Sequence, residues 1–165
     1  MFDDTILLKA RELISSFTAK GLKVATAESC TGGLIIGSLT EISGSSAVVD
    51  RGFVTYSNEA KAELINVPMD LIIEYGAVSE QVARAMVDGA LDNSNADIAV
   101  AVTGIAGPGG GSVEKPTGLV HFSAKRRGHN TLHERIVFGD TGRSQVRTKT
   151  VLHALNMMIA QADLP

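Results

Sequence analysis

The chain has one cysteine, Cys30, few aromatic residues and no long uninterrupted apolar run. A lone cysteine excludes an internal disulfide and every zinc site built on several cysteines. His129 and His133 stand four residues apart, but they lie in a predicted hairpin and do not share a helix face, and no HxH spacing or second cysteine accompanies them. We therefore predict no metal site. No cationic start leads into an apolar run, and none of the runs could span a bilayer. We therefore expect a cytoplasmic protein with no membrane partner.

No charge of one sign dominates the sequence. The formal net charge at pH 7 is −3, from 15 Lys and Arg against 18 Asp and Glu, and the two signs are interspersed. This balance argues against nucleic acid as the main partner and leaves a small metabolite as the ligand. A length of 165 residues suits one compact core, so we predict a single domain over residues 1–165.

Apolar spacing predicts an alternation of helices and short strands. The predicted helices cover residues 5–20, 32–42, 59–65, 80–91 and 143–160, and the predicted strands cover residues 23–27, 47–57, 97–104, 117–125 and 132–138. Asn58, Ser79 and either Asp140 or Thr141 are the predicted helix N-caps. These elements predict an α/β fold, a three-layer α/β/α sandwich with a mixed, mostly parallel central sheet that ends in an edge hairpin.

Polar and reactive side chains stand together in the segment TAESCTGG, where a strand gives way to a helix. In an open α/β sheet, ligands bind beyond the carboxyl ends of the strands, and N–H groups of the next helix attract anions. Ser29 is therefore a candidate nucleophile. The alternative is that Ser29 or Thr31 only caps the helix. Strand alternation turns Cys30 away from the face of Ser29, which predicts a small buried thiol.

The segment TYSNEAK places Tyr56 at a strand end and Lys61 in the first turn of a helix. The positive end of a helix disfavours the charged form of a lysine, so we expect a lowered pKa for Lys61. A partly neutral lysine can accept a proton from a serine. The alternative is a solvated surface lysine, because the sequence does not place Ser29 beside it.

The segment TGIAGPGGG is no Walker loop, because no GK[ST] closes it, and it does not open a helix as a dinucleotide motif must. Its glycines let the backbone pass close to a phosphate or a ribose, and the alternative is a mobile surface connection. Arg143, at the start of the last predicted helix, can clamp a phosphate beside free N–H groups. The candidate phosphate ligands are Gly107, Gly109, Gly110 and Arg143.

Several strings resemble one family. TAESCTGG, GFVTYSNEAK, GAVSE, AVTGIAGPGGG and KPTGLV, in this order, are similar to the C-terminal domain of the competence-damage-inducible CinA proteins. The resemblance covers nearly the whole chain and is weakest over the first predicted helix and after Lys125. It implies a nucleotide substrate and the deamidation of nicotinamide mononucleotide to nicotinate mononucleotide and ammonia. This is a step of pyridine nucleotide salvage that requires no cofactor and no metal.

Carried over position by position, the resemblance makes Ser29 the nucleophile, Lys61 the general base and Tyr56 an assisting tyrosine. Ser29 would attack the carboxamide carbon, Lys61 would pass its proton to the departing ammonia, and water would release the acyl group. Glu28 would balance the pyridinium charge or pair with a neighbouring base. The candidate residues for the oxyanion and the substrate are Glu28, Cys30, Thr31, Gly32, Gly33, Thr103 and Gly104.

Two other functions fit the same residues. One is a catalytically idle nucleotide-binding module with a regulatory or assembly role, and the other is a serine hydrolase for a different amide or ester. The presence of Ser29, Tyr56 and Lys61 together favours the enzyme, because an idle module has no need of all three. Helices rich in Ala and Gly can pair between copies, so we also expect a homo-oligomer.

Overall fold

A computed structural model describes residues 2–165, and its strands form one mixed sheet in the order β2-β1-β3-β4-β5. The strands are β1 (Val24–Glu28), β2 (Val49–Val54), β3 (Ile98–Gly104), β4 (Leu119–Arg126) and β5 (Leu132–Val137). β1 is parallel to both β2 and β3, whereas β4 is antiparallel to β3 and to β5. Among these strands β4 alone therefore runs against the others.

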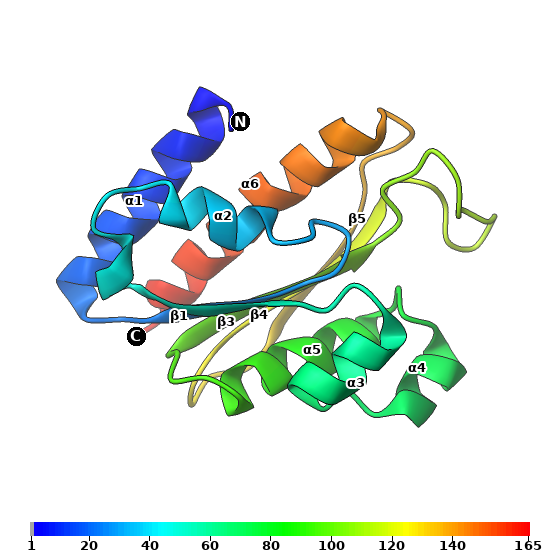
Figure 1. The fold of residues 1–165 in the computed structure, drawn as a ribbon, viewed down its shortest axis with the longest axis horizontal. Helices are drawn as coiled ribbons and strands as arrows, with labels where there is room; N and C mark the ends of the chain where they lie inside the picture. Colours follow the sequence, from blue (N-terminus) through cyan, green and yellow to red (C-terminus); the bar gives the residue numbers. More distant parts are fainter. Residues whose placement is uncertain (1) are drawn as a thin grey trace.

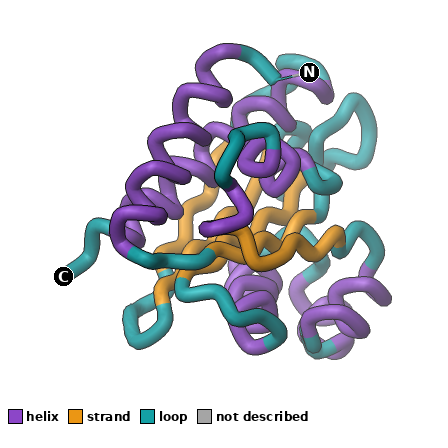
Figure 2. The backbone as a smooth tube through the Cα atoms, turned by 60° about the vertical axis from the view of Figure 1, so that its left-hand side comes forward, coloured by secondary structure: helices purple, strands orange, loops and turns teal. Residues whose placement is uncertain are grey.

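Helices cover both faces of the sheet (Figure 1). One face carries α1 (Asp4–Lys20), α2 (Leu34–Thr40) and α6 (Arg143–Ala162), and the other carries α3 (Asn58–Ile65), α4 (Met69–Tyr75) and α5 (Glu80–Asp92); the short 3-10 turn η1 (Ser45–Ala47) precedes β2. In Figure 2 the sheet is enclosed between these two helical layers. The predicted three-layer α/β/α sandwich is confirmed. Within residues 2–165, every helix is too short or too polar to cross a membrane.

The central strand β3 separates two apolar cores. Ile98, Val100 and Val102 point toward α1 and α6, whereas Ala99 and Ala101 belong to the core under α5. Because both of its faces are covered, β3 has almost no polar side chain, as expected for a strand in the middle of such a sheet. The larger side chains fill the α1 and α6 side, and the alanines allow α5 to pack close to the sheet.

Two of the predicted helix caps are wrong. Ser57, not Asn58, caps α3, and its hydroxyl accepts a hydrogen bond from the Ala60 N–H at 3.0 Å. Neither Asp140 nor Thr141 caps α6, because Gly142 takes that position with φ 91°, a left-handed value that glycine adopts easily. The predicted cap Ser79 is confirmed, since its hydroxyl accepts from the Val82 N–H at 3.3 Å.

The candidate residues gather at one edge of the sheet. Because β1, β2 and β3 run in the same direction, the segments that follow them leave the sheet at the same edge. Ser29 directly follows β1, and Thr55 and Tyr56 directly follow β2. The glycine-rich loop, residues 105–118, follows β3 and projects beyond this edge on the right of Figure 1.

Candidate active site

Ser29 and Lys61 are in direct contact. Lys61 Nζ lies 3.1 Å from Ser29 Oγ. The Ser29 N–H donates to the Val102 carbonyl at 3.1 Å, which holds the serine against the end of β3. The Lys61 residue is only 1% exposed, so it is not a solvated surface lysine. The fold therefore brings together the two residues that the sequence proposed separately.

Burial shifts Lys61 toward its neutral form. Burial lowers the pKa of Lys61 from 10.5 to about 8, because the charged form loses its hydration. The predicted direction of the shift is confirmed, although its largest cause is burial and not the helix end. Nζ also contacts the carbonyl oxygens of Thr55 at 2.8 Å, Tyr56 at 3.4 Å and Ser57 at 3.5 Å. With its N–H groups directed at carbonyls, a neutral amine turns its lone pair to the Ser29 hydroxyl.

Cys30 is a core residue, as predicted. Its side chain packs in the apolar core beside β1, and burial raises the pKa of its thiol to about 12. A thiol with this pKa remains protonated near neutral pH and is a poor nucleophile. Of the two neighbours, only Ser29 presents its side chain to Lys61.

Glu28 stabilises the turn that carries Ser29. Its carboxylate is fully buried at the end of β1. It accepts hydrogen bonds of 2.7–3.1 Å from the hydroxyls of Thr26 and Thr31 and from the N–H groups of Gly33, Ile35 and Ile36. The negative charge thus lies at the N-terminus of α2, where the peptide dipoles favour it. The predicted pairing of Glu28 with a base is wrong, because no ion pair within residues 2–165 includes it.

Glu28→Ala is expected to lower the free energy of unfolding by about 3 kcal/mol, because it leaves several buried donors without an acceptor. Urea unfolding followed by circular dichroism measures the change. Glu41→Ala is the matched control, since Glu41 is exposed at the other end of α2 and should change stability little. A loss of less than about 1 kcal/mol for Glu28→Ala would contradict this role.

The turn after Ser29 leaves two N–H groups free. The Gly32 N–H donates to the Ser29 carbonyl at 3.1 Å, and the Gly33 N–H donates to Glu28 at 3.0 Å. These two predicted oxyanion donors are therefore engaged in shaping the turn. Within the described residues, no carbonyl or carboxylate oxygen accepts a hydrogen bond from the N–H groups of Cys30 and Thr31. They are the donors available beside Ser29.

Arg143 links Tyr56 to the glycine-rich loop. Its guanidinium donates to the Gly107 carbonyl at 3.1 Å and to the Tyr56 hydroxyl at 3.3 Å. The Tyr56 residue is 61% exposed, and within residues 2–165 its hydroxyl has no hydrogen bond to Ser29 or Lys61. Gly109 and Gly110 are exposed in the same loop. The side chains of Tyr56 and Arg143 thus meet at the surface, where Arg143 also holds the buried Gly107 of the loop.

Thr103 and Gly104 complete the end of β3. Thr103 is buried, and its hydroxyl donates to the Ala77 carbonyl at 2.8 Å, which ties the connection between α4 and α5 to the sheet. Gly104 pairs with Val120 of β4. In this structure the Thr103 hydroxyl therefore hydrogen-bonds to the protein's own backbone.

Comparison with known proteins decides the family. The family described as the CinA C-terminal domain matches residues 8–162. The chain belongs to this family. The CinA domain described here is 44% identical over 162 residues to the nicotinamide-nucleotide amidohydrolase PncC of Escherichia coli K12, covering 98% of this chain and 97% of that protein. It is similar in structure to the competence/damage inducible protein CihA from Agrobacterium tumefaciens, with a TM-score of 0.96, 57% identity and 98% of each chain covered.

Other relatives are much longer than this CinA domain. A CinA-like protein of Mycobacterium sp. (strain JLS) is 51% identical over 138 residues, which are 84% of this chain and 32% of that protein. The chain spans about a third, 31–35%, of several further curated relatives. The predicted membership of the CinA C-terminal domain family is confirmed.

Arg147 contacts the turn after Ser29, although no sequence pattern predicted this. Arg147 of α6 donates from Nε to the Cys30 carbonyl at 3.1 Å and from Nη2 to the Thr31 carbonyl at 3.0 Å. It lies four residues after Arg143 and therefore on the same face of α6. The four-residue spacing from Arg143 could have indicated that Arg147 faces the same way, but nothing in the sequence showed that α6 packs against the turn after Ser29.

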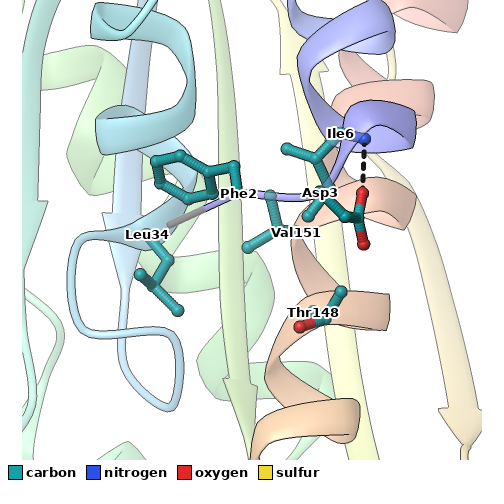
Figure 3. A pocket seen from close by; sticks show the side chains of 6 residues that line it. All are labelled: Phe2, Asp3, Ile6, Leu34, Thr148 and Val151. Carbon is teal, nitrogen blue, oxygen red and sulfur yellow. Dashed lines mark hydrogen bonds between the residues drawn. The ribbon is translucent and has the colours of Figure 1, made fainter.

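A pocket between α1, α2 and α6 lies apart from this site (Figure 3). It is lined by Phe2, Asp3, Ile6, Leu34, Thr148 and Val151. The carboxylate of Asp3 accepts a hydrogen bond from the Ile6 N–H at 2.9 Å, as Figure 3 shows, and so it serves the start of α1. None of the predicted site residues lines this pocket.

Proposed function

We propose that this CinA domain hydrolyses the carboxamide of nicotinamide mononucleotide, giving nicotinate mononucleotide and ammonia in cytoplasmic pyridine nucleotide salvage. The observation that carries the proposal is the buried contact of 3.1 Å between Lys61 Nζ and Ser29 Oγ. The choice of substrate is supported by the full-length similarity to a protein named nicotinamide-nucleotide amidohydrolase. The serine and lysine supply the two roles that amide hydrolysis requires, a nucleophile and a group that moves its proton.

In the first half of the reaction, Ser29 Oγ attacks the carboxamide carbon. Neutral Lys61 takes the hydroxyl proton as the new C–O bond forms, and it gives this proton to the amide nitrogen as the C–N bond breaks. Ammonia leaves, and the nicotinoyl group remains on Ser29 as an ester. The pyridinium ring of the substrate is a cation, so its arrival lowers the pKa of Lys61 further and keeps the amine neutral.

In the second half, water attacks the ester carbon. Lys61 takes a proton from the water and returns it to Ser29 Oγ as the acyl C–O bond breaks, which restores the free enzyme. The N–H groups of Cys30 and Thr31, which lack acceptors within residues 2–165, donate to the oxyanion in both halves. Donors that are already oriented before the reaction stabilise this charge without reorganisation.

Arg143 and the loop from Gly107 to Gly110 bind the phosphate in this proposal. The guanidinium is already positioned by its contacts with Gly107 and Tyr56. A planar guanidinium can form two parallel hydrogen bonds with a phosphate. Tyr56 assists by holding Arg143 in place through the contact of its hydroxyl with the guanidinium.

Arg143→Ala is expected to raise KM for nicotinamide mononucleotide by about tenfold to a hundredfold, because it removes a charged hydrogen bond to the phosphate. KM for nicotinamide riboside, which has no phosphate, should stay nearly unchanged. Steady-state kinetics with both substrates measures the difference. An equal effect on the two would remove Arg143 from phosphate binding.

The proposed function is tested by incubating the purified wild-type protein with nicotinamide mononucleotide in buffer that contains a chelator. We expect equal amounts of ammonia and nicotinate mononucleotide, measured enzymatically and by chromatography. Binding of the nucleotide without ammonia release would support the idle binding module instead. Release of ammonia or acid only from other amides or esters would support the general serine hydrolase.

A further inference from the structure

We propose that Arg147 is a positioning residue that aims the Thr31 N–H at the oxyanion. The inference rests on the proposed function, because it assigns a task to a residue beside the same serine. Arg147 lies on α6, which packs on the face of the sheet opposite to the helix that carries Lys61. Its hydrogen bonds reach two backbone carbonyls and neither Ser29 nor Lys61, so Arg147 acts through the backbone.

The geometry of one peptide unit carries the argument. The Cys30 carbonyl and the Thr31 N–H belong to the same planar trans peptide, so they point in opposite directions. Arg147 Nε donates to this carbonyl at 3.1 Å. A hydrogen bond that anchors the oxygen on the α6 side therefore turns the N–H away from α6. Within the described residues that N–H has no acceptor.

The neighbouring peptide is held by the same side chain. Arg147 Nη2 donates to the Thr31 carbonyl at 3.0 Å, and the N–H of that peptide, from Gly32, donates to the Ser29 carbonyl at 3.1 Å. Two successive peptides are thus fixed by one rigid guanidinium fork. Glu28 fixes the Thr31 hydroxyl from the other side at 2.7 Å. The Thr31 N–H is consequently held in one direction before any ligand arrives.

The charge of Arg147 adds to this orientation. A cation hydrogen-bonded to a carbonyl polarises the whole peptide and strengthens its N–H as a donor, because hydrogen bonds in a chain reinforce one another. The residue is only half-buried, but its neighbour Val146 is fully buried and anchors this turn of α6. Arg147 therefore projects from a well-anchored turn of α6 toward two defined carbonyl acceptors.

Three variants distinguish the orientation of the Thr31 N–H by Arg147 from a purely structural tie and from direct binding of the phosphate. Arg147→Ala removes both hydrogen bonds, and Arg147→Lys keeps the charge but loses the two-pronged contact. Lys149→Ala is the matched control, because Lys149 is exposed on α6 and its side chain makes no hydrogen bond within residues 2–165. Each variant is assayed for thermal unfolding, for kcat and KM with nicotinamide mononucleotide, and for the rate at which diisopropyl fluorophosphate labels Ser29.

We expect Arg147→Ala to lower kcat by about tenfold to a hundredfold, a smaller decrease than the complete loss of an oxyanion donor would cause. KM should stay within about twofold of the wild-type value. Labelling of Ser29 should slow in parallel, because the phosphoryl oxygen uses the same donors. Arg147→Lys should fall between wild type and Arg147→Ala, and Lys149→Ala should match wild type. All kinetic comparisons are made well below the unfolding temperature of each variant.

Other results would overturn the proposal. A folded Arg147→Ala variant with wild-type kcat and labelling would make Arg147 a purely structural tie, and a raised KM with unchanged kcat would make it a ligand of the phosphate. If the wild type labels at Ser29 but releases no ammonia, the amidase function fails, and the labelling rates alone decide the role of Arg147. A wild type that does neither would overturn both.

Discussion

Ser29→Ala is expected to abolish ammonia release from nicotinamide mononucleotide, lowering kcat by about a thousandfold or more while the nucleotide still binds. The hydroxyl that Lys61 contacts at 3.1 Å is the group removed, and the methyl of alanine leaves the turn intact. Ammonia release measures the activity, and isothermal titration calorimetry measures the binding. Retained binding shows that the site itself is preserved.

Cys30→Ala is the matched control for this experiment. The thiol is buried with its pKa raised to about 12, so its removal should leave kcat near the wild-type value and cost only some stability. If Ser29→Ala keeps its activity while Cys30→Ala loses it, the nucleophile is Cys30 and the proposed mechanism fails.

Lys61→Met is expected to lower kcat by about 10² to 10⁴, because methionine fills the same buried space without a group that accepts a proton. In the wild type, kcat/KM should rise as the pH increases toward about 8 and then level off, since burial lowers the pKa of Lys61 to about 8 and only the neutral amine is active. Lys149→Met on the exposed surface of α6 should keep the wild-type rate and profile.

The lowered pKa of Lys61 also predicts how the free energy of unfolding depends on pH. Between about 8 and 10.5, the two pKa values of Lys61, the unfolded chain holds a proton that the folded chain has lost. The contribution of Lys61 to the free energy of unfolding therefore increases with pH in this window and is absent from Lys61→Met. A wild-type profile of kcat/KM that shows no rise as the pH increases toward about 8 would remove Lys61 as the base.

The sequence predicted the elements of the site better than their assembly. Ser29 and Lys61 are each marked by a local pattern, a strand end before glycines and the first turn of a helix. Their contact depends on the pairing of β2 with β1, which brings the segment after β2 next to the turn after β1. Strand order is a long-range property, so no local pattern could have shown it.

Other differences between the sequence-based predictions and the structure also arise from long-range packing. The pKa of Lys61 is lowered mainly by burial, which depends on everything packed around α3 and not on the helix end alone. The Gly32 and Gly33 N–H groups are engaged because Glu28 and the Ser29 carbonyl take them, a competition that spacing does not show. The contact of Arg147 with the turn after Ser29 depends on how α6 packs, which no local pattern shows. Composition and periodicity were sufficient for the layers of the fold.

Glu28 has a consequence for how a ligand can lie in the site. The start of a helix after a β-strand is where many α/β proteins receive the phosphate of a nucleotide. Here that place is taken by a carboxylate of the protein itself, held by backbone N–H groups of α2. An anionic group entering there would meet a resident negative charge, whereas the positively charged ring of a pyridinium nucleotide would not. The domain thus carries its own internal anion at this helix end, and we expect that anion to favour the approach of a positively charged ring over that of a phosphate.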